Sequence, residues 1–133
     1  MSDYTIRHLH EVDDAFGGQY PGAMRFMTGP LETEQIAITH RHMPPKSGGK
    51  GSYGHRHKTQ EEIYYVIAGT LEFKLGDEVV ELGPHTAVKV PPHVYRSVWN
   101  ARPEDAELLI VSTTIDDVEA DVELMENFWP ETE

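Results

Sequence analysis

Two histidines and a glutamate in the middle of the chain have the residue types and the spacing of a metal site. His55 and His57 are two residues apart, so on a β-strand their imidazoles project from the same face. Glu62 follows a short polar turn and begins the apolar run that continues with Ile63. Two adjacent antiparallel strands can therefore direct two nitrogens and one carboxylate oxygen at one point. This ligand set suits a divalent metal ion (Fe, Mn, Ni, Zn or Co), with coordination positions left open for a substrate.

Histidine is unusually frequent in this chain, with eight among 133 residues and six of them between positions 40 and 93. Imidazole is the commonest metal ligand in proteins and transfers protons near neutral pH. For most of these histidines, surface placement is the simpler interpretation. His40 and His42 share one face of a predicted strand with Ile36 and Ile38. If that face lines the interior, the two histidines reach the cavity. We favour the alternative, in which they lie near a solvated strand end.

Composition excludes several other kinds of chemistry and partner. The chain has no cysteine, which rules out disulfides, thiolate metal sites and a cysteine nucleophile. Its net charge of −12 argues against binding to nucleic acid or to anionic membranes. No apolar run approaches the roughly 20 residues that cross a bilayer, and the first residues lack the pattern of a secretory signal. We therefore expect a small-molecule ligand as partner, no nucleic acid, no membrane, and the cytoplasm as the default location.

The elements that must position these residues are β-strands. Period-two alternation broken by Gly and Pro predicts about eight short strands, at the regular spacing of a β-sandwich or barrel. Besides the segment around His55, the predicted strands cover residues 35–43, 63–68, 70–75, 79–82, 86–90, 94–99 and 107–115. Turn residues predict a hairpin at Ala68-Gly69 and another at Gly76-Asp77.

The two ends of the chain differ from this pattern, although nothing divides residues 1–133 into more than one domain. Residues 1–33 are polar and glycine-rich and predict an irregular lead-in with one short strand, before a barrel over 34–115. The tail, 116–133, has apolar residues at helical spacing with acidic residues between them. It predicts a short amphipathic helix over 116–128, with Phe128 and Trp129 packed on the barrel.

The segment around the two histidines resembles the first motif of the cupin superfamily, which runs Gly-x5-His-x-His-x3,4-Glu-x6-Gly. The matching residues are Gly49, His55, His57, Glu62 and Gly69. A second motif, Gly-x5-Pro-x-Gly-x2-His-x3-Asn, is matched in part. Its last four fixed places hold Pro91, His93, Arg96 and Asn100. The resemblance implies an all-β fold, a double-stranded β-helix or jelly-roll barrel, with the site in its open end. It also implies that His55, His57 and Glu62 are the metal ligands.

Arg96 is the main departure from the family pattern, because it stands where the fourth ligand, a histidine, is expected. A guanidinium has no lone pair to donate to a metal. Two arrangements are physically reasonable. In the first, a metal binds His55, His57 and Glu62, and Arg96 binds a carboxylate or phosphate of the substrate. In the second, Arg96 forms an ion pair with Glu62, and the cavity is a metal-free binding site.

His93 and Tyr64 complete the predicted substrate-binding residues. His93 replaces a glycine of the second motif, in the turn after Pro91-Pro92. It is expected at the rim of the cavity rather than among the ligands, because it has the opposite strand parity to Arg96. Tyr64 belongs to the predicted strand that follows Glu62 and is expected to line the cavity, although aromatic residues in barrels are often ordinary core.

Three functions fit this sequence. The first is a metal-dependent cupin that binds or acts on a small anionic organic acid or sugar-like metabolite, with dioxygenase or isomerase chemistry. The second is a non-catalytic, metal-free binding or sensor protein in which Arg96 pairs with Glu62. The third, a metal-independent sugar epimerase or isomerase with a histidine base, lacks a clearly placed acid–base partner. The resemblance also implies a homodimer, since small cupins commonly pair or exchange N-terminal strands.

Overall fold

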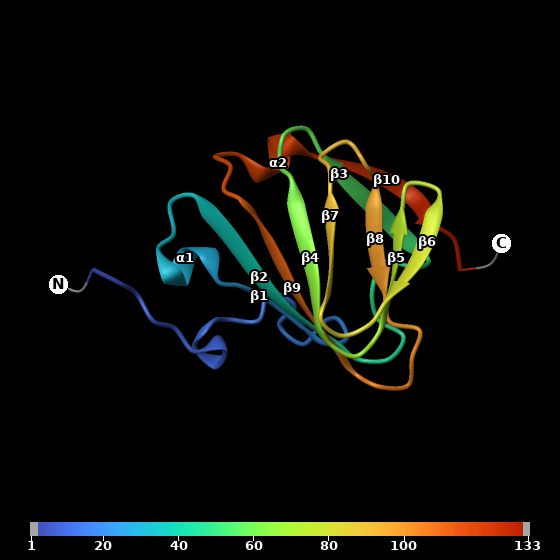
Figure 1. Cartoon of the computed structure of the whole chain (residues 1–133), viewed down its shortest axis with the longest axis horizontal. Helices are drawn as coiled ribbons and strands as arrows, with labels where there is room; N and C mark the ends of the chain where they lie inside the picture. Colours follow the sequence, from blue (N-terminus) through green and yellow to red (C-terminus); the bar gives the residue numbers. More distant parts are fainter. Residues whose placement is uncertain (1–2, 132–133) are drawn as a thin grey trace.

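The chain folds into two antiparallel sheets that enclose a common core (Figure 1). The computed structural model describes residues 3–131, and within them each sheet has five strands. The first sheet consists, in order, of β1 (Ala23–Phe26), β2 (Ile36–Met43), β9 (Ala106–Thr113), β4 (Glu62–Ala68) and β7 (Thr86–Val90). The second consists of β10 (Val122–Trp129), β3 (Ser52–His57), β8 (Arg96–Trp99), β5 (Leu71–Leu75) and β6 (Glu78–Leu82). The predicted all-β architecture is confirmed.

Within residues 3–131, helical structure is confined to short segments. They are η1 (Leu9–Glu11), α1 (Thr28–Leu31) and α2 (Val118–Asp121). None of the helices described between residues 3 and 131 has the length and apolar character needed to cross a membrane.

The core lies between the two sheets and is built from alternate residues of the facing strands. Val66 and Leu108 are paired neighbours on β4 and β9 and are fully buried in the first sheet. Leu71, Phe73 and Val98 belong to the same buried cluster from the second sheet. Residues that lie two apart on a strand project from one face, so each strand supplies one row of side chains to the interior.

The sequence left open which face of β2 meets the interior, and the structure shows that it is the face of Arg41 and Met43. Met43 is fully buried and Arg41 lines the interior cavity, whereas Ile36, on the opposite face, is 56% exposed. The register explains the difference, because Arg41 pairs with the core residue Leu108 of β9. The alternation showed that β2 has two different faces, and the more polar one, which includes Arg41, meets the cavity.

The hairpin predicted at Gly76-Asp77 is confirmed, since β5 and β6 pair from Leu75↔Glu78 onward. The one predicted at Ala68-Gly69 is wrong, because β4 and β5 belong to different sheets. Gly69 has φ +78°, and a Cβ there would lie 2.6 Å from the carbonyl oxygen of Asp105. Only glycine allows the chain to cross between the sheets at this close approach.

The amphipathic C-terminal helix predicted over 116–128 is also wrong. Only Val118–Asp121 is helical, and Val122–Trp129 forms β10, which pairs with β3 from Val122↔His57 to Trp129↔Ser52. Without β10, β3 would lie at the edge of its sheet with unpaired backbone groups, so tertiary pairing outweighs the helical periodicity of the tail. Phe128 and Trp129 are buried, as expected.

The lead-in reaches the barrel through a turn held by Asp14. The Asp14 carboxylate accepts hydrogen bonds from the backbone N–H of Met24 and of Phe16, and these bonds lower its pKa. The turn brings Phe16 and Tyr20 to the wall of the interior cavity. The lead-in therefore contributes to the cavity rather than only covering a sheet.

Candidate functional site

His55, His57 and Glu62 converge inside the barrel. The Nε2 atoms of His55 and His57 lie 3.7 Å and 3.4 Å from Oε1 of Glu62. One potential ligand atom from each residue lies within 4.8 Å of the others. Two atoms that bind one ion at about 2.1 Å are roughly 3 to 4 Å apart, so this cluster has the dimensions of a metal site. The three residues predicted from spacing are thus brought together.

The strands that carry these residues are not the neighbours expected from the sequence. His55 and His57 lie on β3 of the second sheet, and Glu62 begins β4 of the first. The ligand atoms therefore meet across the interior, between the two layers. The equal parity of the histidines was predicted correctly, because both rings face this point.

His57 is oriented by a carboxylate that the sequence did not reveal. Its Nδ1 lies 3.1 Å from Oδ2 of Asp121, at the end of α2. Because a carboxylate accepts, this contact places the ring proton on Nδ1 and leaves the lone pair on Nε2. That Nε2 is buried and has no hydrogen-bond partner. A buried lone pair directed at Glu62 and at the second imidazole is what a metal ligand requires.

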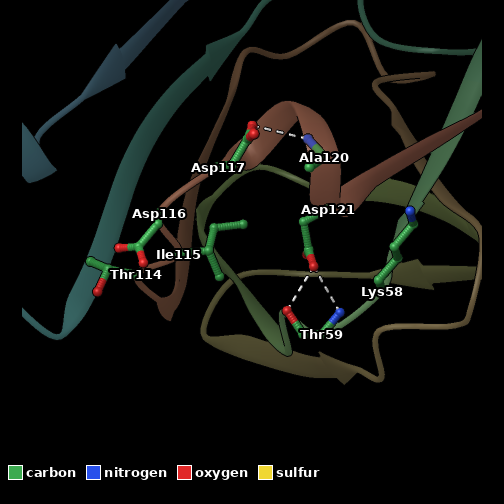
Figure 2. A pocket seen from close by; sticks show the side chains of 8 residues that line it. All are labelled: Lys58, Thr59, Thr114, Ile115, Asp116, Asp117, Ala120 and Asp121. Atoms are coloured by element: carbon green, nitrogen blue, oxygen red, sulfur yellow. Dashed lines mark hydrogen bonds between the residues drawn. The ribbon is translucent and has the colours of Figure 1, made fainter.

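Asp121 is itself held in place by the chain that links β3 and β4 (Figure 2). Its carboxylate accepts hydrogen bonds from the Thr59 hydroxyl at 2.6 Å and the Thr59 N–H at 3.0 Å, both drawn in Figure 2. It also accepts one from the Gln60 N–H at 3.2 Å. Burial acts to raise the pKa of Asp121, but these hydrogen bonds outweigh it and lower the pKa. The α2 helix that presents Asp121 begins at Asp117, whose side chain accepts from the N–H of Ala120. Asp121 therefore stays ionised and fixed beside His57.

Glu62 is ionised although it is buried. Burial acts to raise its pKa, but His55, His57 and the Tyr64 hydroxyl outweigh that effect and hold the pKa well below its usual range. The Tyr64 hydroxyl donates to Oε1 at 2.9 Å. Burial raises the pKa of Tyr64 itself well above its usual value, so this hydroxyl remains a donor. The cluster thus presents an ionised carboxylate to two imidazoles, and a metal ion that binds all three residues would displace any proton held between them.

Arg96 lies beside this cluster and is only 1% exposed. Its Nε is 3.6 Å from Oε1 of Glu62 and has no hydrogen-bond partner. Its two terminal nitrogens instead donate to backbone carbonyls. They are those of Pro92 at 3.3 Å, Val94 at 2.9 Å, Val90 at 3.5 Å and Pro91 at 3.4 Å. The fork that would bind a substrate anion is therefore turned toward the protein backbone.

A cavity of about 430 Å³ opens onto the cluster from within the barrel. His55, Tyr64 and Arg96 connect it to the cluster, while Phe16 and Tyr20 of the lead-in form another part of its wall. This volume falls in the range of small-molecule sites. A second pocket lies at the surface around α2 and is lined partly by Asp117 and Asp121 (Figure 2).

The other predicted histidines lie outside the cluster. His93 is exposed in the turn before β8 and does not line the cavity. His40 is directed at Glu107 with a separation of 3.8 Å, and His42 contacts Asp105 at 2.9 Å. His42, whose side chain is 41% exposed, is solvated as the favoured interpretation expected, whereas the side chain of His40 is only 12% exposed.

Two residues of the site were missed from the sequence. Asp121 is 64 positions from His57, and its segment was interpreted as a structural helix. Arg41 was not among the predicted site residues, but it lines the cavity. For Asp121 the sequence holds no local signal. For Arg41 the alternation of β2 showed two faces without indicating which of them lines the cavity.

Comparison with known proteins shows which family and which solved structures this chain resembles. A family model described as a cupin domain matches residues 39–112. A search of curated proteins found no match. A crystal structure of a cupin protein from Bacteroides fragilis has a TM-score of 0.68 at 19% identity, covering 89% of this chain and 90% of that one.

Two further solved structures of the same fold bear functional names. One, described as a sugar phosphate isomerase from the cupin superfamily of Silicibacter pomeroyi, has a TM-score of 0.69 at 14% identity and covers 91% of this chain and 92% of that one. The other is the polyketide cyclase RemF from Streptomyces resistomycificus, with a TM-score of 0.66 at 20% identity, covering 82% and 78%. At these identities the likeness identifies the two-sheet barrel as a jelly roll.

Proposed function

The chain belongs to the cupin domain family, and from this premise we propose that it binds a divalent metal and a small anionic metabolite in its barrel. His55, His57 and Glu62 would hold the metal, and the adjoining cavity would hold the metabolite. The observation that carries this proposal is the buried, unpartnered Nε2 of His57, 3.4 Å from Glu62.

The bound metal would supply a Lewis acid that polarises an oxygen of the metabolite and orients it, as oxygenase or isomerase chemistry requires. The chain's own residues prepare this site. Asp121 holds His57 in the tautomer that leaves Nε2 free, and Tyr64 holds the Glu62 carboxylate by its hydroxyl. His55 is the cluster residue that also faces the cavity, so ligand exchange would take place on its side.

The names of two structural relatives are consistent with such a site. A sugar phosphate isomerase and a polyketide cyclase share the fold, and both names denote chemistry on oxygen-rich small molecules. We place this chain's substrate in the class of small organic acids or sugar-like metabolites, because a buried cation site and a cavity of about 430 Å³ suit an anionic compound of that size.

Metal analysis tests the proposal directly. Protein purified without added metal would be challenged in turn with Fe, Mn, Ni, Co and Zn, and the bound metal measured by elemental analysis. We expect about one ion per chain for the wild type and a loss of at least tenfold in occupancy for His57→Ala. His10→Ala is the matched control, because it removes an exposed imidazole far from the cluster in sequence. Wild-type protein that takes up less than about a tenth of an ion per chain would exclude the metal site.

A second candidate function rests on Arg96. Its Nε lies 3.6 Å from Glu62 Oε1, so its charge can neutralise that carboxylate without a metal. The barrel would then be a metal-free binding or sensor module in which His55 and His57 donate hydrogen bonds. Arg96→His separates the two functions. Metal uptake by this variant together with none by the wild type would favour the metal-free protein.

A further inference from the structure

Arg41 is a cation inside the barrel whose position the proposed metal site does not explain. It lies on β2, two residues before the fully buried Met43, and its side chain lines the same cavity as His55 and Tyr64. Burial lowers the pKa of its guanidinium, yet arginine stays protonated in proteins. The cavity therefore contains a permanent positive charge at a point separate from Arg96.

This charge has no partner in the part of the chain that the structure describes. The ion pairs between residues 3 and 131 do not include Arg41, and its buried Nε has no hydrogen-bond partner. Its guanidinium lies 5.6 Å from the centroid of the Phe16 ring, which presents a face to the cation without neutralising it. The side chain of Arg41 is half-buried with a buried Nε, and an unpaired charge in such a place is costly. The folded chain therefore keeps it at a cost in stability unless an external anion binds.

The cavity wall carries positively charged side chains although the protein as a whole is negatively charged. The chain has a net charge of −12, but among its described residues the cavity wall includes two arginines and no aspartate or glutamate. Arg96 is balanced by Glu62 and donates both terminal nitrogens to backbone carbonyls. Arg41 has neither kind of partner, so its planar fork remains available to a ligand.

We propose that Arg41, rather than Arg96, binds the anionic group of the metabolite, and that this group is a carboxylate or a phosphate held at the β2 side of the cavity. The inference rests on the proposed function in that the cavity is the ligand site, but it does not depend on the metal. Phe16 packs on the guanidinium from the lead-in, and Arg41, Tyr64 and His55 line the same cavity. The substrate we propose combines an anionic group held by Arg41 with an oxygen that reaches the cluster on its His55 side.

Small probe anions test this role. Binding of benzoate, of the neutral isostere benzamide and of inorganic phosphate would be measured by calorimetry at constant ionic strength. We expect the wild type to prefer an anion over benzamide, and the stronger of benzoate and phosphate identifies the group. Arg41→Gln is expected to weaken anion binding about ten- to a hundredfold while leaving benzamide unchanged, and Arg41→Lys to retain part of it. Arg7→Gln, which removes the same charge from an exposed position, should match the wild type.

The unfolding temperature of an Arg41 variant distinguishes a binding role from a structural role, and metal content separates this inference from the proposed metal site. In buffer free of these anions, Arg41→Met should unfold at a higher temperature than the wild type, because it removes an unpaired, half-buried charge. A lower temperature would identify Arg41 as a structural residue and overturn the inference. Equal anion affinity in wild type and Arg41→Gln, an equal loss in Arg7→Gln, or no anion preference in the wild type would also overturn it. Arg41-dependent anion binding without metal uptake would leave this inference standing and remove only the proposed metal.

Discussion

Replacing Asp121 by asparagine tests the claim that a residue far from the motif controls the metal site. The substitution keeps the shape of the side chain but removes its charge. One carboxylate oxygen faces both His57 Nδ1, at 3.1 Å, and the Gln60 N–H, at 3.2 Å, while the other accepts from the backbone and hydroxyl of Thr59. Asparagine has a single acceptor oxygen, so one of these two sides must face an NH₂ group.

Each orientation of the new amide has a predictable consequence. If the NH₂ group faces His57, it also faces the Gln60 N–H, and two donors then meet without an acceptor. The His57 ring must in that case accept a hydrogen bond at Nδ1. The ring proton then moves to Nε2, which can no longer bind a metal. If the NH₂ group faces Thr59, the contact with His57 survives without its charge, and a backbone N–H loses its acceptor. Loss of such an outer carboxylate typically lowers metal affinity about 10- to 100-fold, which is about 1.4 to 2.7 kcal/mol.

The assay is competitive metal titration against a chelating dye, with the ¹⁵N shifts of the His57 ring recorded on the metal-free protein. We expect weaker binding in the range above and a change of tautomer or of hydrogen bonding at His57. Thermal unfolding of the metal-free variant should show a loss of about 1 to 3 kcal/mol, from the unsatisfied donor. The metal titrations are therefore carried out well below the temperature at which the variant unfolds.

Asp117→Asn is the matched control for this substitution. It removes one charge from the same segment, but its side chain caps α2 through the N–H of Ala120, a role that asparagine performs equally well. Metal affinity for this variant should equal that of the wild type. If Asp121→Asn bound metal within twofold of the wild type, or if both variants lost affinity equally, Asp121 would not orient His57.

Three further predictions concern the barrel that supports the site. Leu108→Ala, in the fully buried core, should lower the free energy of unfolding by about 2 to 5 kcal/mol in urea titrations, and a loss under 1 kcal/mol would contradict the packing described. Gly69→Ala should destabilise the protein more than Gly76→Ala does. A Cβ at position 69 would lie 2.6 Å from the Asp105 carbonyl oxygen, whereas a Cβ at position 76 would have open space around it. Equal urea midpoints of unfolding for the two variants would refute this reasoning. Burial lowers the pKa of His40 from 6.5 despite a nearby carboxylate, so the unfolded chain binds a proton at this residue more readily than the folded chain does. The stability that the neutral ring contributes above pH 6.5 is therefore lost as the pH falls below 6.5. His40→Gln should reduce the difference in unfolding free energy between about pH 7 and pH 5.5 in urea titrations, and an unchanged difference would contradict this assignment.

Local spacing was sufficient to predict the cluster and most of the strands. His55 and His57 share a face in any extended conformation, and the glycines and prolines between apolar runs mark where strands end. Gly69 was recognised as the end of a strand, although the crossing between sheets that it allows was predicted as a hairpin. These features depend on a few consecutive residues and are therefore readable without a structure.

The tail and β2 show where such reasoning fails. Residues 122–129 have apolar positions compatible with a helix, but they form β10 because β3 offers an unpaired edge. The alternation of β2 defines two faces and cannot say which of them meets the cavity. That choice follows from the pairing of Arg41 with Leu108 on a strand almost 70 positions away.

The chain by itself determined the donor set, namely two imidazoles of equal parity and a carboxylate at the start of an apolar strand, since side-chain direction follows from backbone period. Tertiary structure alone decided that these donors meet across two sheets, that Asp121 orients His57, that the fork of Arg96 faces the backbone and that Arg41 faces the cavity. The physical reason is that these contacts join segments tens of residues apart, whose approach depends on sheet order and register. Periodicity within one strand carries no information about either.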